Sequence, residues 1–177
     1  MKFFKLICLT LFFNTQVRAQ NLFWTNKVIN DILELKLPVN FKTTKESYIT
    51  TLSGTVKNKY YAVTSYDTTL EKTPDLKAFQ TSLTRFYKGL LIKDTARYTT
   101  SFREASVGGT NGIMAYLRAK KKSEKYKQKY FYVTFANQRF YLFEIFDPSS
   151  RQNLDDVHFF FDAVKFSPGK IEETFLK

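Results

Sequence analysis

Two neighbouring segments of this 177-residue chain are apolar on both faces, and this pattern limits the folds open to it. They are residues 130–136 and 139–146, separated by Asn137-Gln138, a polar pair short enough to turn a hairpin. In the first segment, alternation places Phe131, Val133 and Phe135 on one face and Tyr130 and Tyr132 on the other. In the second segment, Tyr141, Phe143 and Ile145 lie on one face and Phe140 and Leu142 on the other. Strands of this kind need cover on both sides. We therefore predict a three-layer domain with this hairpin at the centre of an antiparallel sheet.

Further strands are indicated by alternation, by Thr, Tyr and Val enrichment, or by the turns that bound them. Lys57-Asn58 and Gly108-Gly109 provide two of these turns. The sheet should thus hold about six to seven strands, the others being 32–37, 48–56, 59–66, 96–107 and 112–121. Residues 20–31 show no regular alternation, and we expect them to form a strap across the sheet, anchored by Leu22, Phe23 and Trp24.

Two helices are expected to cover this sheet. Residues 75–90 follow Thr73-Pro74, an N-cap and a first-turn proline, and carry apolar residues at steps of three and four. A second helix over 150–163 is expected after a cap at residues 147–150, with Leu154, Val157, Phe161 and Val164 on one side. Asp155 and Asp156 lie in its early turns, where negative charge opposes the positive end of the helix dipole.

The order of these elements resembles the Mog1/PsbP-like fold. The resemblance spans roughly residues 30–168 and is carried by LKLPVNF, DLKAFQTSLTRFYKGL, GGTNGIMAYLRA, YFYVTFANQRFYLFEI and AVKFS. It implies an α+β architecture in which an antiparallel sheet is sandwiched between helices. Members of the superfamily include photosystem assembly proteins, a Ran-binding nuclear protein and bacterial envelope proteins, so the resemblance implies an architecture and no single activity.

The N-terminus has the pattern of a secretory signal peptide. A charged MKFFK precedes an apolar run over residues 6–13, and Val17-Arg18-Ala19 meets the small-residue rule for cleavage after Ala19. An uncleaved membrane anchor is the alternative, but this run is far shorter than the roughly 20 residues that span a bilayer. We expect residues 20–177 to form one exported domain, periplasmic or extracellular. Loss of Lys2, Lys5 and Arg18 lowers its formal charge from +12 to +9.

Composition and motifs argue against most catalytic chemistries. A 44% hydrophobic content excludes low-complexity disorder, and one Cys and one His exclude a disulfide scaffold and a Cys/His zinc site. His158 lies within an apolar helical stretch, and the adjacent acids Asp155-Asp156 and Glu172-Glu173 point to different sides of their elements. The glycine-rich segment 108–112 is not expected to bind phosphate, because the residues after it alternate as a strand does and do not form the helix that a phosphate loop requires. We predict no catalytic, cofactor-binding or metal-ligating residues, and a site assembled only in three dimensions is the alternative.

The one segment with a binding signature is the run over residues 118–129. It holds seven basic residues and one acid, Glu124, for a net charge of +6. The predicted anion-binding residues are Arg118, Lys120, Lys121, Lys122, Lys125, Tyr126, Lys127 and Lys129, with Tyr126 exposed for stacking on sugars or bases. Such a patch attracts polyanions or anionic lipid, although lysines give little bidentate recognition, so no specific nucleic-acid binding is expected.

Three roles therefore stay open at this stage. The chain could bind a protein partner of the cell envelope or the extracellular space, or use the basic run to bind an anionic polymer or a membrane surface. The run could also be a solvated hairpin tip whose lysines discourage edge-to-edge aggregation.

Overall fold

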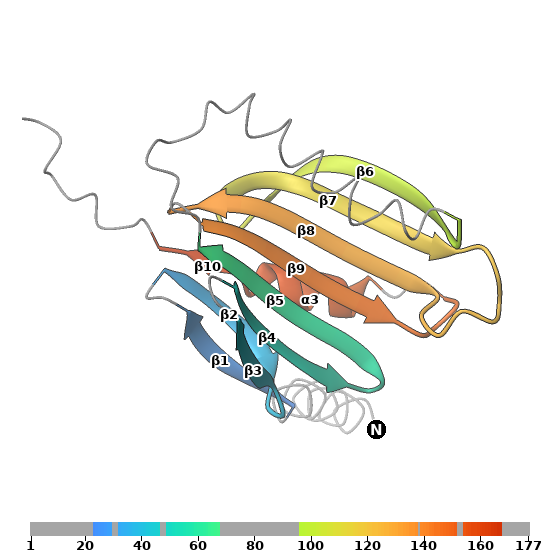
Figure 1. Cartoon of the computed structure of the whole chain (residues 1–177), viewed down its shortest axis with the longest axis horizontal. Coiled ribbons are helices and arrows are strands. Elements are labelled where there is room, and N and C mark those ends of the chain that lie inside the picture. Colours follow the sequence, from blue (N-terminus) through green and yellow to red (C-terminus); the bar gives the residue numbers. More distant parts are fainter. Residues whose placement is uncertain are drawn as a thin grey trace, which may run out of the picture.

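The computed structural model describes residues 23–29, 32–46, 49–67, 96–137, 139–151 and 154–167, and these form ten strands and one helix. Seven strands make one antiparallel sheet, of order β3-β4-β5-β9-β8-β7-β6, and three make a small sheet, of order β1-β2-β10 (Figure 1). The bounds are β1 (Trp24–Ile29), β2 (Leu33–Pro38), β3 (Lys42–Glu46), β4 (Ile49–Val56), β5 (Lys59–Asp67), β6 (Tyr98–Val107), β7 (Thr110–Ala119), β8 (Gln128–Ala136), β9 (Arg139–Asp147), α3 (Asp155–Asp162) and β10 (Lys165–Phe166).

The hairpin predicted from its two-sided apolar pattern is at the centre of the large sheet, as β8 and β9. Tyr132 and Phe143 are fully buried in the cluster on one face of the sheet. Val133 and Leu142, their chain neighbours, are buried in the cluster on the other face. The expected alternation of the two strands is therefore confirmed. The strands β8 and β9 contribute buried side chains to the clusters on both faces of the large sheet.

Helix α3 and the small sheet cover one face of the large sheet (Figure 1). Phe161 packs edge-on against Tyr132, with 6.1 Å between ring centroids, and Phe160 lies 6.4 Å from Phe143. In the residues described, a helix lies on one face only, so a sheet sandwiched between helices is not supported. The expected helix over 75–90 lies outside the described residues, as does the expected signal peptide over 1–19.

Helix α3 is shorter than predicted, and its cap is different. It begins at Asp155 instead of residue 150, and its N-cap residue, Leu154, makes no side-chain capping bond and is 44% exposed. The preceding loop is held by the sheet, because Gln128 Nε2 donates to the carbonyls of Ser149 and Arg151 at 3.0 and 2.8 Å. Those bonds hold residues 149 and 151 against β8.

The strands at the N-terminal end also depart from the prediction. Residues 24–29 are the regular strand β1 instead of an irregular strap, paired antiparallel with β2. Strand β3 was not predicted, because all five of its residues are exposed and leave no apolar alternation to detect. Strand β2 forms as expected, with Leu33, Leu35 and Leu37 buried, but it belongs to the small sheet and not to the large one.

Two tight turns form where the sequence predicts them. Lys57 and Asn58 have φ of 48° and 65°, and Gly108 and Gly109 have φ of 60° and 85°. Positive φ at both central residues is the geometry that matches the twist of paired strands. Because β7 begins at Thr110, the glycine-rich segment is a hairpin connection and not a phosphate loop.

Candidate anion-binding loop and neighbouring pockets

Residues 118–129, here called the basic loop, comprise the connection between β7 and β8 together with the strand ends on either side of it, at one end of the large sheet (Figure 1). Backbone hydrogen bonds tie it to the surrounding strands. The amide of Lys120 donates to the carbonyl of Arg97 at 2.9 Å, and the amide of Lys127 donates to the carbonyl of Asp147 at 2.9 Å. The loop is thus anchored beside the start of β6 and at the end of β9.

Charged groups inside the loop hold its shape. Glu124 is only 9% exposed and forms an ion pair with Arg97 through both carboxylate oxygens. The ammonium of Lys127 donates to the carbonyls of Lys122 and Glu124. Lys127 therefore closes the loop on itself, and its charge is directed inward instead of toward a ligand.

Aromatic rings occupy the inner side of the same loop. Tyr126 is half-buried, with its ring 5.4 Å from that of Phe146, and its carbonyl accepts a hydrogen bond from the Tyr98 hydroxyl at 2.9 Å. The ammonium of Lys129 lies 4.4 Å from the ring centroid of Tyr98. The prediction of an exposed Tyr126 is therefore wrong, because the ring packs against the sheet. Tyr126 and Lys129 build the loop instead of standing free in solvent.

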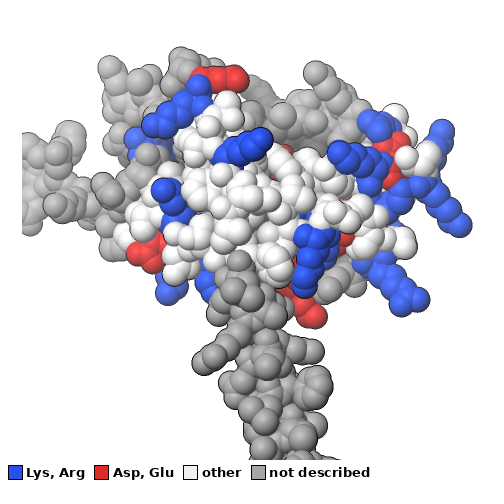
Figure 2. Space-filling model, turned by 90° about the horizontal axis from the view of Figure 1, so that it is seen from below, with Lys and Arg blue, Asp and Glu red and all other residues white. Residues whose placement is uncertain are grey.

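The remaining predicted residues do reach the surface. Figure 2 shows Lys and Arg side chains gathered at the right-hand end of the molecule, where the basic loop lies. The exposed members of the loop are Arg118, Lys120, Lys121, Lys122 and Lys125. A fixed backbone thus presents five cationic side chains at one end of the sheet, and their summed field attracts anions.

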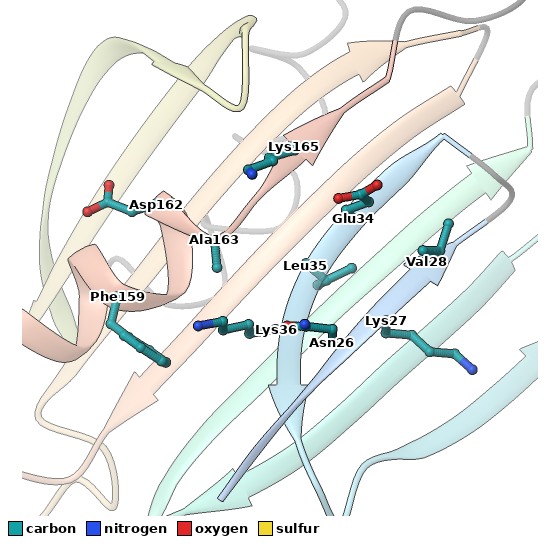
Figure 3. A pocket seen from close by; sticks show the side chains of 10 residues that line it. All are labelled: Asn26, Lys27, Val28, Glu34, Leu35, Lys36, Phe159, Asp162, Ala163 and Lys165. Carbon is teal, nitrogen blue, oxygen red and sulfur yellow. The ribbon is translucent and has the colours of Figure 1, made fainter. Parts of the chain in front are cut away.

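A pocket of about 480 Å³ lies between the small sheet and α3 (Figure 3). Its wall carries charges of both signs. Lys165 of β10 faces Glu34 on the adjacent strand, and the ammonium of Lys36 lies 4.8 Å from the ring centroid of Phe159. Asp162 also lines it, while the side chain of Lys27 turns away from the centre of the pocket. This mixture of charge does not point to one class of ligand.

A second, larger pocket, here called the β6–α3 groove, has a volume of about 730 Å³. It lies between α3 and the part of the same sheet face that β6, β7 and β8 form. His158, the one histidine of the chain, is exposed at its edge. The strands and the helix could be predicted from the sequence, but the open space between α3 and β6 could not.

A buried ion-pair cluster joins β5, β9 and α3. The ammonium of Lys59, which is 9% exposed, lies 3.0 Å from Asp147 Oδ2 and 2.5 Å from Asp156 Oδ2. Burial alone would lower the pKa of Lys59, but hydrogen bonds to the two carboxylates outweigh it and raise the pKa above its usual value. Asp155 and Asp156 lie in the first helical turn as predicted, yet Asp156 also has this partner, 97 residues away in the sequence.

A second buried carboxyl belongs to Glu144, on the opposite face of β9. Burial raises its pKa to about 7, and the nearby charge of Lys129 opposes that rise. Glu144 is not among the residues lining either pocket described above.

The described ranges contain no group of three or more His, Cys, Asp or Glu side chains placed to hold a metal ion. Of the helices in these ranges, none has the length and apolar character needed to cross a bilayer.

The chain has a PsbP-like fold, in which a seven-stranded antiparallel sheet carries a small sheet and a helix on one face. The solution structure of cyanobacterial PsbP (CyanoP) from Synechocystis sp. PCC 6803 is similar to it, with a TM-score of 0.55 and 13% sequence identity. The similarity covers 81% of this chain and 92% of that chain. No protein-family model matches the sequence, and no curated protein matches it. The resemblance to the Mog1/PsbP-like fold is thereby confirmed as a statement of architecture.

Proposed function

We propose that this chain is an exported, non-enzymatic accessory module of a bacterial-type cell envelope, which binds its partner through the basic loop. The observation that carries the proposal is the loop's construction. Glu124, Tyr126 and Lys127 are used to hold the backbone, and five other cationic side chains are left exposed on it. These contacts hold the backbone in one shape, so the exposed cations are presented in a fixed arrangement.

The ligand that this surface fits is an anionic polymer or an acidic face of an envelope protein. Four of the five exposed cations are lysines, which act as point charges and do not fix the geometry of a planar anion. Binding should therefore depend on charge density and on salt, with little selectivity among polyanions. The single exposed Arg118 is the residue best suited to a bidentate contact.

An enzymatic role receives less support from the same residues. The carboxyl with a strongly raised pKa, Glu144, is not part of either described pocket, and the charged residues of the smaller pocket are of mixed sign. The non-enzymatic proposal rests on this placement together with the absence of nucleophilic and metal-binding motifs in the sequence.

Heparin chromatography tests the proposal with two variants of equal charge. The first replaces Lys120, Lys121, Lys122 and Lys125 with Gln, and the second replaces Lys42, Lys45, Lys57 and Lys165, which are also exposed but lie elsewhere. The first variant should elute at clearly lower salt, because fewer counterions are released on binding. The second should elute close to the unmodified chain. Equal shifts in both variants would show that only net charge matters, and would contradict a role for the loop.

A further inference from the structure

The β6–α3 groove has walls of different character. Its floor is the surface of β7 and β8, formed by Met114, Tyr116 and Tyr130, and one wall is the side of α3 that carries Val157 and Phe161. One large apolar side chain at its rim is unusually accessible, Leu154 at 44%. The volume, about 730 Å³, falls within the range of ligand pockets, which are mostly apolar with a few polar groups.

The floor of this groove is more apolar than its two tyrosines suggest. The hydroxyls of Tyr116 and Tyr130 both donate to Oε1 of Gln128, at 3.1 and 2.9 Å. Gln128 is itself 1% exposed and uses its amide to bind the 148–151 loop. Because these hydroxyl donors are already engaged below the surface, the floor presents ring and methyl carbons to an occupant.

The groove has a positively charged side chain, Arg103, on one rim and a negatively charged one, Asp162, on the opposite rim. Arg103, on β6, is exposed. Its guanidinium donates to the thioether sulfur of Met114 at 3.5 Å, and a thioether sulfur is a weak acceptor. None of the Asp and Glu side chains in the described ranges forms an ion pair with it. Asp162, on α3, lines the facing wall. An anionic group would therefore be attracted to the β6 rim and repelled from the helix rim.

We infer that the β6–α3 groove binds a monomeric single-chain amphiphile with an anionic head, the head on Arg103 and the apolar chain along Tyr116, Tyr130 and Phe161. The apolar floor accounts for the chain, and the Arg103 guanidinium, which has no carboxylate partner among the described residues, accounts for the head. This site is separate from the basic loop and goes beyond the proposed function, which concerns polymeric or protein anions.

Sodium dodecanoate, kept below its critical micelle concentration, is the probe, and isothermal titration is the measurement. We expect saturable binding that Arg103→Gln weakens by roughly tenfold or more, since a charge-assisted contact is lost. The matched control is Lys45→Gln, which removes one positive charge from β3 at the opposite edge of the sheet and should leave affinity unchanged. Dodecyltrimethylammonium, with the same chain and a cationic head, should bind much more weakly than dodecanoate.

A second variant tests the apolar part of the site. Ala105→Trp places a large ring in the groove from β6 and should abolish dodecanoate binding, with circular dichroism used to verify that the fold persists. The inference is overturned if Arg103→Gln and Ala105→Trp both bind dodecanoate as the unmodified chain does. It is equally overturned if dodecyltrimethylammonium binds as tightly as dodecanoate, or if the chain binds only anionic vesicles. Loss of heparin binding in the four-lysine loop variant with dodecanoate binding intact would show that the two sites are independent.

Discussion

Lys59 Nζ lies 3.0 Å from Oδ2 of Asp147, which fastens the first residue of β5 to the last residue of β9. Both side chains are almost removed from solvent, at 11% and 2% exposure. Asp156 approaches the same ammonium from the first turn of α3. One buried cation thus links two neighbouring strands of the large sheet to the helix that covers them.

Removal of this cation should destabilise the fold. Lys59→Met leaves Asp147 buried without its partner, and breaking a buried pair on one side costs about 3 to 5 kcal/mol. Lys57→Met, in the adjacent exposed turn, is the control and should change the free energy of unfolding by less than about 0.5 kcal/mol. Urea denaturation of the three proteins measures both values. A cost below about 1 kcal/mol for Lys59→Met would show that the cluster contributes little.

Two phenylalanines of the central hairpin, Phe143 and Phe135, should differ in their contribution to stability. Phe143 is fully buried between Tyr132 and α3, and Phe143→Ala should cost about 3 to 5 kcal/mol. Phe135 is only partly buried, near the β8–β9 turn, so Phe135→Ala should cost less. Equal losses on chemical denaturation would contradict the assignment of the core to the middle of the hairpin.

The glycine turn between β6 and β7 offers a matched pair of substitutions. Both Gly108 and Gly109 have positive φ, which costs an alanine roughly 1 to 2 kcal/mol. A Cβ on Gly108 would also lie 2.7 Å from the carbonyl oxygen of Val164, whereas a Cβ on Gly109 would meet nothing within 4 Å. Gly108→Ala should therefore lower the melting temperature more than Gly109→Ala does. The reverse order would place Val164 away from this turn.

Stability should depend on pH through Glu144. Its pKa in the folded chain, about 7, is above the usual 4.5, so folding favours the protonated form. This contribution is complete below pH 4.5 and is lost as the pH rises from 4.5 to 7, and the total is roughly 3 to 4 kcal/mol at about 1.4 kcal/mol per pKa unit. Glu144→Gln should remove this loss, so that the variant is more stable than the unmodified chain at pH 8 and similar to it at pH 4.5.

An exposed carboxyl provides the comparison for that experiment. Glu46→Gln, on edge strand β3, should leave the pH dependence of unfolding unchanged. Denaturant midpoints at several pH values between 4.5 and 8 separate the two variants. A Glu144→Gln protein that keeps the full slope would mean that another group titrates in this window.

The sequence by itself determined the central part of the sheet and the position of its turns. Alternation in β2, β8 and β9 is a local property with a period of two, so the apolar positions could be assigned to faces without any knowledge of their partners. The turn at Lys57-Asn58 could likewise be predicted, since two short polar residues between strands favour a tight hairpin. The presence of a basic surface loop also follows from residues 118–129 alone.

Only the tertiary structure decided which polar groups face each other. β3 has no buried residue and so no pattern to detect, and it becomes a strand because β4 offers it an edge. Lys59 and Asp156 are far apart in the chain, and their pairing depends on where α3 packs. In the basic loop, Tyr126 turns inward because Phe146 and Tyr98 lie beneath it. Burial patterns are encoded locally, whereas the contacts of individual charges and rings depend on the packing of distant elements.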